Sequence, residues 1–286
     1  MAFRRPILNI FHSEVDVSTF AKYTYLTPLL ALLISVVPST QAATYTAHSP
    51  ANRVALLELY TSEGCSSCPP ADAWLIQTGA QADPKRVIPL ALHVDYWNSL
   101  GWKDRFSDRK FTTRQQELAA FVHSKVVYTP EVFVAGRELR RWSDTNDFDH
   151  IIKNITAQPS AADIEIKLSS GTTARSYDLS SNVKLRGSSP QGVQNFQTYI
   201  ALYENKLVSN IAAGENSGVT LHHDYVVRQW LGPYPLKDGA ANINENIALD
   251  KIQGGIKTGQ FGVVVFVQNA SNGEVLQALR LQPGIE

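Results

Sequence analysis

The sequence contains few cysteines and no excess of charge of either sign. Its 286 residues include two cysteines, 26 Lys and Arg, and 26 Asp and Glu. Two cysteines exclude a disulfide-dense scaffold and a four-thiolate zinc site within one chain. A formal net charge of zero provides no broad electrostatic surface for nucleic acid or an anionic membrane. We therefore expect no nucleic-acid partner.

Long hydrophobic runs are also scarce, and the clearest one lies near the start of the chain. Residues 26–37 read LTPLLALLISVV, which is too short to span a bilayer comfortably. Thr40 and Ala42 then fit the −3 and −1 positions of a secretory cleavage site. The pattern predicts a signal peptide over residues 1–42, with a retained signal anchor as the alternative. The mature chain would then be periplasmic or secreted, without stable membrane insertion, in a compartment that permits disulfides.

Two regions of different sequence pattern follow the predicted signal peptide. Residues 54–60 and 87–94 are mostly apolar, as in strands buried on both faces, and a helical pattern separates them. This strand–helix–strand order predicts parallel strands. From residue 159, apolar and polar residues alternate, as at 164–168, and Ser, Gly and Asn separate short strands. We expect an α/β domain at residues 43–158, followed by an all-β sandwich-type domain at residues 159–286.

Both cysteines stand in one short motif, Cys65-Ser66-Ser67-Cys68, after a predicted strand and at the start of a predicted helix. At positions i and i+3, the two sulfurs can join with little movement of the backbone. The amino end of a helix favours a thiolate through its partial positive charge and free amide hydrogens. Cys65, nearer the helix end and the surface, is expected to attack. Cys68, one turn further in, is expected to resolve the mixed disulfide.

Three other interpretations of the cysteine pair stay open. A purely structural disulfide is common in exported proteins, although a four-residue ring removes little entropy from the unfolded chain. A functionless free dithiol is the second. The third is a metal site, which would need additional ligands, and no histidine stands at a recognisable spacing from the cysteines. We expect neither a metal nor a cofactor. The histidines that could contribute to a metal site are His93, His123, His222 and His223.

Pro130 directly precedes a predicted strand at residues 132–134. A proline at this place can adopt a cis peptide bond and expose the preceding backbone, with an ordinary trans turn proline as the alternative. The motifs occur in the order strand, CxxC, helix, strand, helix, Thr-Pro, strand. This combination is much more specific than either the CxxC or the Thr-Pro motif alone.

With this order of motifs, the sequence resembles the thioredoxin-like superfamily. More closely, it resembles an uncharacterised family of exported bacterial proteins that is known only as a domain of unknown function. The stretches that carry the resemblance lie in both halves of the mature chain, at residues 57–72, 92–108, 114–115, 127–137 and 214–228.

The superfamily resemblance implies a thioredoxin-like fold for the α/β domain. It also implies attack by Cys65, resolution by Cys68, a cis peptide at Pro130, and pairing of the substrate with the backbone of Thr129. Two departures from the superfamily pattern are visible. The interval from Cys68 to Pro130 is long, which implies an insertion, and Glu63-Gly64 precedes Cys65 where a Trp is typical.

The expected insertion contains an aromatic segment that follows the second strand. The carboxyl ends of parallel strands meet at one edge of a sheet, where ligands of α/β proteins bind. Asp95, Tyr96, Trp97 and Trp102 are therefore predicted to approach the CxxC and to line a substrate groove. The alternative is that Trp97 and Trp102 pack as a lid without substrate contact.

Two titratable residues in the predicted strands are candidates for proton transfer. Glu58 interrupts a buried-strand pattern upstream of Cys65, and a buried carboxylate there could take the proton from Cys68. A surface-facing Glu58 is the alternative. His93 could shuttle protons, although we favour a hydrogen-bonded core histidine.

The segment HHDYVVR at residues 222–228 is the most polar motif of the second half. We expect a strand with Tyr225 and Val227 inward and the charged side chains outward. A first alternative is that Arg228 pairs with an acidic residue such as Asp224 or Glu215. An interface with the first domain is the functional alternative for this segment.

Together these features predict thiol–disulfide exchange on another exported protein or a small thiol, with an unidentified redox partner. The alternative is a non-catalytic binding module that retains a structural CxxC disulfide in an inherited fold. Exposure of Cys65 beside an open groove would favour the enzyme. Occlusion of the sulfurs by the Trp97–Trp102 segment would favour the binding module.

Overall fold

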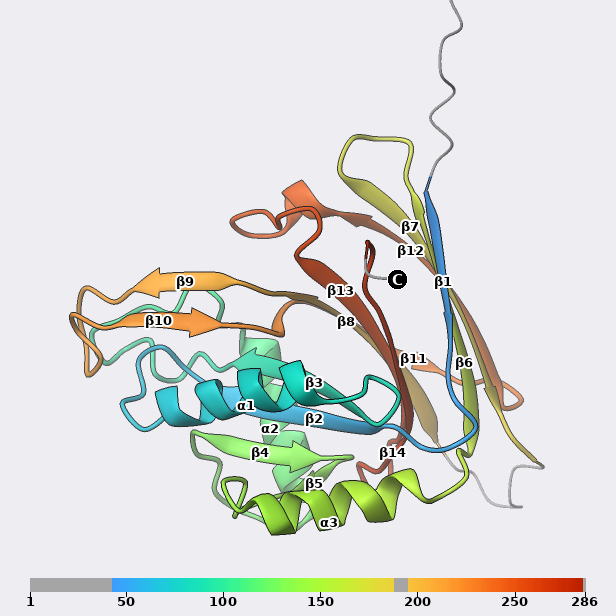
Figure 1. The fold of residues 1–286 in the computed structure, drawn as a ribbon, viewed down its shortest axis with the longest axis horizontal. Coiled ribbons are helices and arrows are strands. Elements are labelled where there is room, and N and C mark those ends of the chain that lie inside the picture. The colour runs from blue at the N-terminus through green and yellow to red at the C-terminus, as the bar shows by residue number, and fades with distance from the viewer. Residues whose placement is uncertain (1–42, 188–194, 285–286) are drawn as a thin grey trace, which may run out of the picture. The chain divides into compact units, whose positions relative to one another are not determined.

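The computed structural model describes residues 43–187 and 195–284, so the predicted signal peptide at residues 1–42 lies outside the described residues. Residues from Ala42 onward belong to one compact unit. Its described part contains three α-helices, one short 3₁₀ helix at Leu249–Lys251 and fourteen strands (Figure 1). None of the helices in the described ranges is long and apolar enough to cross a membrane.

An eight-stranded sheet runs through the unit in the order β14-β13-β8-β11-β3-β2-β4-β5. β2 and β3 pair in parallel over their whole length, which confirms the predicted parallel pair. On its other side, β3 pairs in parallel with β11 from the second half of the chain. The strands are β2 (Ala55–Thr61), β3 (Val87–His93), β4 (Glu131–Val134), β5 (Arg137–Glu138), β8 (Phe196–Glu204), β11 (Val226–Pro235), β13 (Phe261–Asn269) and β14 (Val275–Leu281).

The prediction of a thioredoxin-like α/β domain followed by an all-β sandwich-type domain is wrong. Four strands from the first half and four from the second half form one continuous sheet, and strands outnumber helices throughout the described unit. The sequence pattern misled because an apolar run identifies a strand that is buried on both faces. It does not identify the neighbouring strands, since pairing joins backbone groups that all residues share.

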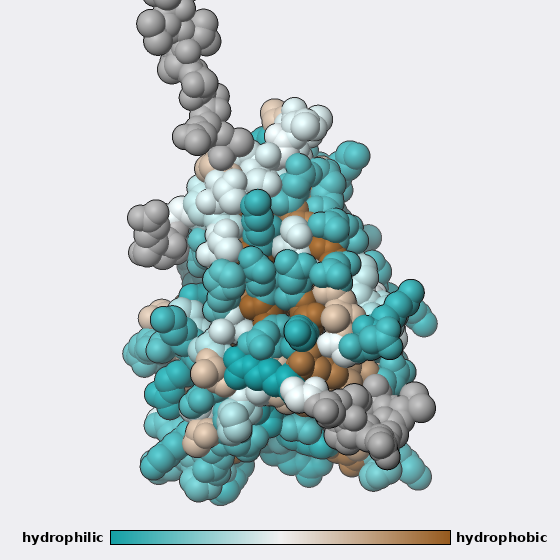
Figure 2. All heavy atoms as spheres, turned by 90° about the vertical axis from the view of Figure 1, so that its right-hand side faces the viewer, coloured by the Kyte–Doolittle hydropathy of each residue, from teal (hydrophilic) through white to brown (hydrophobic). Residues whose placement is uncertain are grey.

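A four-stranded antiparallel sheet, in the order β1-β6-β7-β12, packs against one part of the large sheet. Buried and exposed residues alternate along β6, as the alternating sequence pattern predicts. The inward residues Ile164, Ile166 and Leu168 share a core with Ile200 and Val265 of the large sheet. The opposite, outer side is largely hydrophilic (Figure 2). The strands are β1 (Thr44–His48), β6 (Ala162–Ser170), β7 (Ser176–Leu185) and β12 (Ala240–Ala248).

The helices cover both faces of the large sheet around β2, β3 and β4 (Figure 1). α1 (Pro69–Gln81) and α3 (Thr145–Thr156) pack on the face of the sheet that carries Leu57 and Leu59 of β2. α2 (Arg109–Phe121) packs on the opposite face. α2 and α3 begin at aspartate caps, because the carboxylates of Asp108 and Asp144 accept backbone N–H groups of the first turns.

A short hairpin and a long loop gather at the end of the sheet where α1 begins. The hairpin consists of β9 (Leu207–Asn210) and β10 (Thr220–His223), which pair antiparallel. The loop at residues 94–108 follows the carboxyl end of β3, and its Arg105 donates a hydrogen bond to the carbonyl of Val208 in β9. Figure 1 shows both segments beside the amino end of α1. The fold thus brings segments from both halves of the chain to the CxxC motif.

Candidate functional site

Cys65 and Cys68 form a disulfide at the amino end of α1, with their Cα atoms 5.4 Å apart. The Sγ atom of Cys65 lies 3.8 Å from the carbonyl oxygen of Thr129 and 3.3 Å from the hydroxyl of Ser67. The Thr129–Pro130 peptide bond is cis, as the resemblance implied. The structure therefore places Thr129 and Pro130 beside the CxxC motif, although 64 residues separate Cys65 from Thr129 in the sequence.

Both cysteines are fully buried, with an exposed fraction of 0%. Trp97 borders the motif, because its Nε1 donates to the hydroxyl of Thr129 at 2.7 Å and its Cβ would lie 3.4 Å from a Cβ added at Gly64. From the second half of the chain, the Asn216 side chain donates to the Cys65 carbonyl at 3.0 Å. Glu215 accepts the backbone N–H of the exposed Ser66 at 3.0 Å. We call Trp97, Glu215 and Asn216 the cap.

The other predicted substrate-binding residues divide into two groups. Tyr96 is exposed near the cap, and its hydroxyl lies 3.4 Å from the Gln115 side chain. Asp95 accepts the hydroxyl of Thr112 at 2.6 Å and thereby anchors the loop to α2. Trp102 donates to Glu63 at 2.8 Å, just before the motif. Asp95 and Trp102 thus hold protein groups, while Tyr96 and Trp97 border the disulfide region.

Gln115 of α2 connects the cap region to the strand after Pro130. Its amide donates to the Tyr128 carbonyl at 2.7 Å and to the Glu131 carboxylate at 2.6 Å. Burial, together with nearby Glu138, raises the pKa of Glu131 to about 7, although the bond from Gln115 opposes the shift. A carboxyl group that titrates near neutral pH therefore stands one residue after the cis proline.

Glu58 is buried in β2, so the surface-facing alternative is wrong. Its carboxylate forms a two-point ion pair with Arg114 of α2, at 2.6 and 3.1 Å. Burial lowers the pKa of Arg114, but the charge of Glu58 outweighs this effect and the net shift is upward. The ion pair balances the charge of the Glu58 carboxylate. Transfer of a proton between Glu58 and Cys68 stays a prediction, and no contact joins the two side chains in the described structure.

Five buried titratable side chains lie next to the CxxC, and we call them the acid–histidine cluster. Nδ1 of His93 lies 2.6 Å from a carboxylate oxygen of Asp104, which also accepts the backbone N–H of Glu63. The rings of His93 and His223 stand 5.0 Å apart, edge to face. Opposite ring nitrogens of His223 face Glu63 at 3.4 Å and Asp72 at 3.9 Å. The cluster combines residues from α1, β3, β10 and the loops before α1 and after β3.

Mutual charges set the ionisation of the cluster. Burial lowers the pKa of His93, but Asp104, with help from Asp72 and Glu63, outweighs it and raises the pKa to about 8. Burial raises the pKa of Asp104, yet His93 holds the pKa of that carboxyl below its usual value. Burial also opposes ionisation of Glu63, whose pKa is lowered by the nearby His223 and by the hydrogen bond from Trp102. Asp72 differs, because burial raises its pKa against the opposing histidines.

Sequence reasoning missed most of this cluster. The structure confirms His93 as a hydrogen-bonded core histidine, but Glu63 and Asp72 were not singled out. The expectation that the charges of residues 222–228 point outward is wrong for His223, which is buried. Arg228 pairs with Glu204, not with Asp224 or Glu215. A signal for Asp72 existed, since a residue four positions after Cys68 shares its helix face.

The histidine ligands considered for a metal site do not assemble. His93 and His223 meet in the cluster, whereas His123 and His222 are exposed. Within residues 43–187 and 195–284, no group of three or more His, Cys, Asp or Glu side chains is arranged to hold a metal ion.

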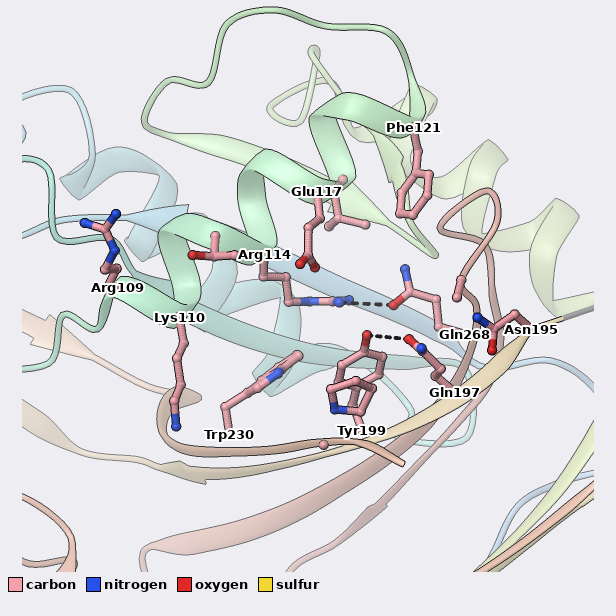
Figure 3. Close-up of a pocket in the computed structure, with 15 residues that line it drawn as sticks. Arg109, Lys110, Arg114, Glu117, Phe121, Asn195, Gln197, Tyr199, Trp230 and Gln268 are labelled. Atoms are coloured by element: carbon pink, nitrogen blue, oxygen red, sulfur yellow. Dashed lines mark hydrogen bonds between the residues drawn. The ribbon is translucent and has the colours of Figure 1, made fainter. Parts of the chain in front are cut away.

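A cavity of about 740 Å³ opens on the α2 face, between α2 and the second-half strands of the large sheet (Figure 3). Tyr199 and Trp230 form its aromatic wall, and the guanidinium of Arg114 lies over both rings. Arg114 also donates to Gln268 at 3.1 Å. The cysteines do not line this cavity, so it is separate from the disulfide.

Residues 56–268 match one family model, described as "Protein of unknown function (DUF1223)". The chain belongs to this family. The match covers the CxxC, Pro130 and His223, so the family region includes the disulfide, the cap and the whole acid–histidine cluster. A search of curated proteins gives no match.

Two of the solved structures that match this chain resemble it over most of its length. Protein AGR_C_4864 from Agrobacterium tumefaciens is 22% identical with a TM-score of 0.58, over 83% of this chain and 98% of that chain. HBP35 of Porphyromonas gingivalis is 17% identical with a TM-score of 0.60, over 83% of this chain and 79% of that chain. At these identities the likeness concerns the fold, and it extends over both halves of the chain.

Proposed function

We propose that the protein catalyses thiol–disulfide exchange through Cys65 and Cys68. The observation that carries the proposal is the place of the disulfide at the amino end of α1, with the Cys65 sulfur beside the Thr129 carbonyl. In the reduced state, the helix end would favour a Cys65 thiolate. An extended substrate could pair with the Thr129 backbone next to that sulfur. The proposal includes export, which residues 1–42 predict.

The loss of stability that the residues around the disulfide impose supports a functional role for this bond. A four-residue ring constrains the unfolded chain little, so the bond is a poor staple. Beside it, the protein buries three carboxyl groups and two imidazoles, which is expensive for stability. Clusters of buried titratable groups with shifted pKa values are typical of functional sites. This chemistry does not require a thioredoxin-like domain, and a distant relationship to that superfamily stays a prediction from the sequence resemblance.

The exposed apolar residues support a polypeptide substrate. The large hydrophobic side chains exposed in the described structure fall in three segments, which are the 94–108 loop, the stretch before Pro130 and the β9–β10 hairpin. All three segments border the CxxC region through the contacts of the cap, Thr129 and Arg105. We propose that they receive an apolar stretch of an exported protein. These side chains are Tyr96, Leu100, Val126, Tyr128, Val208 and Val219.

A second candidate function is a non-catalytic binding module with a structural disulfide. The observation that favours it is the complete burial of Cys65 and Cys68, with Trp97 bonded to the neighbouring Thr129. Exchange requires the cap to open, because an attacking thiolate has to reach the Cys65 sulfur. The two candidates therefore differ in whether the disulfide is reachable and reducible in the folded protein.

The reduction potential of the Cys65–Cys68 disulfide, measured against glutathione in the folded protein, tests the two candidates. Structural disulfides have reduction potentials below about −300 mV, and we expect the potential of this disulfide to lie well above that value. Transfer of electrons to a disulfide-bonded model protein should cease in Cys65→Ser while folding is preserved. Trp97→Ala should accelerate reduction by a dithiol, since it removes the bond to Thr129.

The control is Trp142→Ala, which removes a tryptophan that packs on Trp74 and is not one of the cap residues. It should leave the rate of disulfide reduction unchanged. A potential below about −300 mV, or full turnover in Cys65→Ser, would reject the exchange function and favour the binding module.

A further inference from the structure

Reduction of the buried disulfide requires a proton at a place that water does not reach. When the bond breaks, the electron pair stays on the Cys68 sulfur, and Cys68 is 0% exposed. A thiolate in a buried site is costly unless it is protonated or paired. A proton donor inside the protein would remove this cost. Among the buried acids, the position of Asp72 is the most suitable.

Asp72 lies one helical turn after Cys68. The backbone N–H of Asp72 donates to the Cys68 carbonyl at 3.1 Å, so the two residues have the i, i+4 relation of an α-helix. Side chains in this relation lie on one face, with Cβ atoms roughly 5–6 Å apart. Helical side chains also lean toward the amino end of their helix, which for Asp72 is the end that carries Cys68. Glu58, the acid expected from the sequence, is instead bound to Arg114.

The carboxyl group of Asp72 is poised to hold a proton. Its Oδ2 atom is buried and has no hydrogen-bond partner among the described residues. Burial raises its pKa above the usual aspartate value. The charged and titratable groups that face it are His223 of β10, His93 of β3 and Asp104 of the following loop. The protonated form is therefore favoured at a higher pH than for an exposed aspartate.

We propose that Asp72 is the internal proton donor for Cys68 when the disulfide is reduced. This inference rests on the proposed exchange function and assigns a role that the family description leaves open. The pKa of His93 is raised to about 8, and its charge would offset the negative charge that remains on Asp72 after the transfer.

The step balances with a dithiol as the reductant. A thiolate of the dithiol attacks the Cys65 sulfur, and the bond between the Cys65 and Cys68 sulfurs breaks. The proton of the Asp72 carboxyl passes to the Cys68 sulfur, which leaves a carboxylate. The second thiol of the dithiol loses its proton to solvent and attacks the mixed disulfide, and Cys65 leaves as a thiolate. The dithiol is oxidised to a disulfide, and the protein disulfide gains two electrons.

The test is the rate of reduction of the full folded chain by dithiothreitol, corrected for the thiolate fraction of the reagent, over the whole pH range from about the usual aspartate pKa upward in which the protein stays folded. In the wild type, the corrected rate should fall as the pH rises and Asp72 loses its proton. Asp72→Asn should lower the rate about 100-fold or more at low pH and abolish this fall, since general acids contribute roughly 10²–10⁴-fold. Asp72→Glu retains a carboxyl group and should restore part of the pH dependence.

Two further variants separate Asp72 from other acids. Asp149→Asn makes the same chemical change on an exposed part of α3 and should behave as the wild type. Glu131→Gln removes the other carboxyl group with an elevated pKa and should leave the fall in rate intact. The assignment would be overturned if the reduction rate no longer decreased with rising pH in Glu131→Gln but still did so in Asp72→Asn.

The proposal on Asp72 and the exchange function fail in different ways. If the wild type is reduced readily but Asp72→Asn shows the same pH profile and rate, Asp72 is not the donor and the exchange function stands. If the wild-type disulfide is not reduced while the protein stays folded, the exchange function fails and the role of Asp72 fails with it.

Discussion

At the scale of single residues, Arg114 shows how one side chain ties the two halves of the chain together. Its guanidinium bonds to Glu58 of β2 and to Gln268 of β13, and it lies over the rings of Tyr199 and Trp230. It is buried, so its charge is balanced by Glu58 and not by water. We infer that this contact serves stability and is separate from the chemistry of the disulfide.

Replacement of Arg114 tests this inference. Arg114→Met should lower the free energy of unfolding by about 3–5 kcal/mol, because it leaves Glu58 as an unpaired buried charge. Denaturant unfolding of the purified protein measures the loss. The double variant Arg114→Met/Glu58→Gln should recover a large part of it, since no ionised group is then buried alone. A loss below about 1 kcal/mol in the single variant would show that Glu58 is neutral or solvated.

At the scale of elements, the close packing of Gly79 against the sheet fixes the position of α1. A Cβ added at Gly79 would overlap the ring of Tyr225 and lie 2.8 Å from Pro89 of β3. The glycine therefore lets the last turns of α1 pack directly on β3 and on the segment between β10 and β11. This packing matters for the site, because the same helix carries Cys68 and Asp72 at its amino end.

Gly79→Ala should destabilise the protein by about 1–3 kcal/mol through overpacking. The sign of the change in the free energy of unfolding is informative, because a glycine-to-alanine change in an exposed helix stabilises by roughly 1 kcal/mol. Thermal or denaturant unfolding measures the difference from the wild type. Ala80→Gly, at the neighbouring exposed position, serves as the control and should cost about 1 kcal/mol through helix propensity alone. A stabilised Gly79→Ala variant would contradict the close packing of α1.

At the scale of the whole molecule, the large sheet joins both halves of the chain. β11 pairs with β3 at Val226 and Ala91, and the core beneath α2 contains residues of β2, β3, β8, β13 and β14. The cap on the disulfide also comes partly from the second half, through Glu215 and Asn216. Neither the core nor the capped disulfide is complete in one half alone.

A fragment of residues 43–158 should therefore not fold by itself. It would expose the edge of β3 and the apolar face that α2 shares with the second half. We expect weak chemical-shift dispersion and no cooperative unfolding transition, in contrast to the chain from residue 43 to 286. A cooperative transition in the fragment would show that the first half is an independent domain.

The sequence predicted the local elements and the local motif well. The strands β2, β3 and β4, the start of α1 at the cysteines, and the position of Trp97 near the motif follow from periodicity, helix-start signals and chain order. These features depend on neighbouring residues, so a single sequence contains the information for them. The cis bond at Pro130 was implied by the resemblance to the thioredoxin-like superfamily and is present.

Only the tertiary structure decided which strands share a sheet and which side chains share a site. The pairing of β3 with β11 joined the two halves, and the burial of His223 beside Glu63 and Asp72 formed the acid–histidine cluster. Both depend on contacts between residues far apart in the chain. The alternation of polar and apolar residues indicates which face of a strand is buried, but not what packs against it.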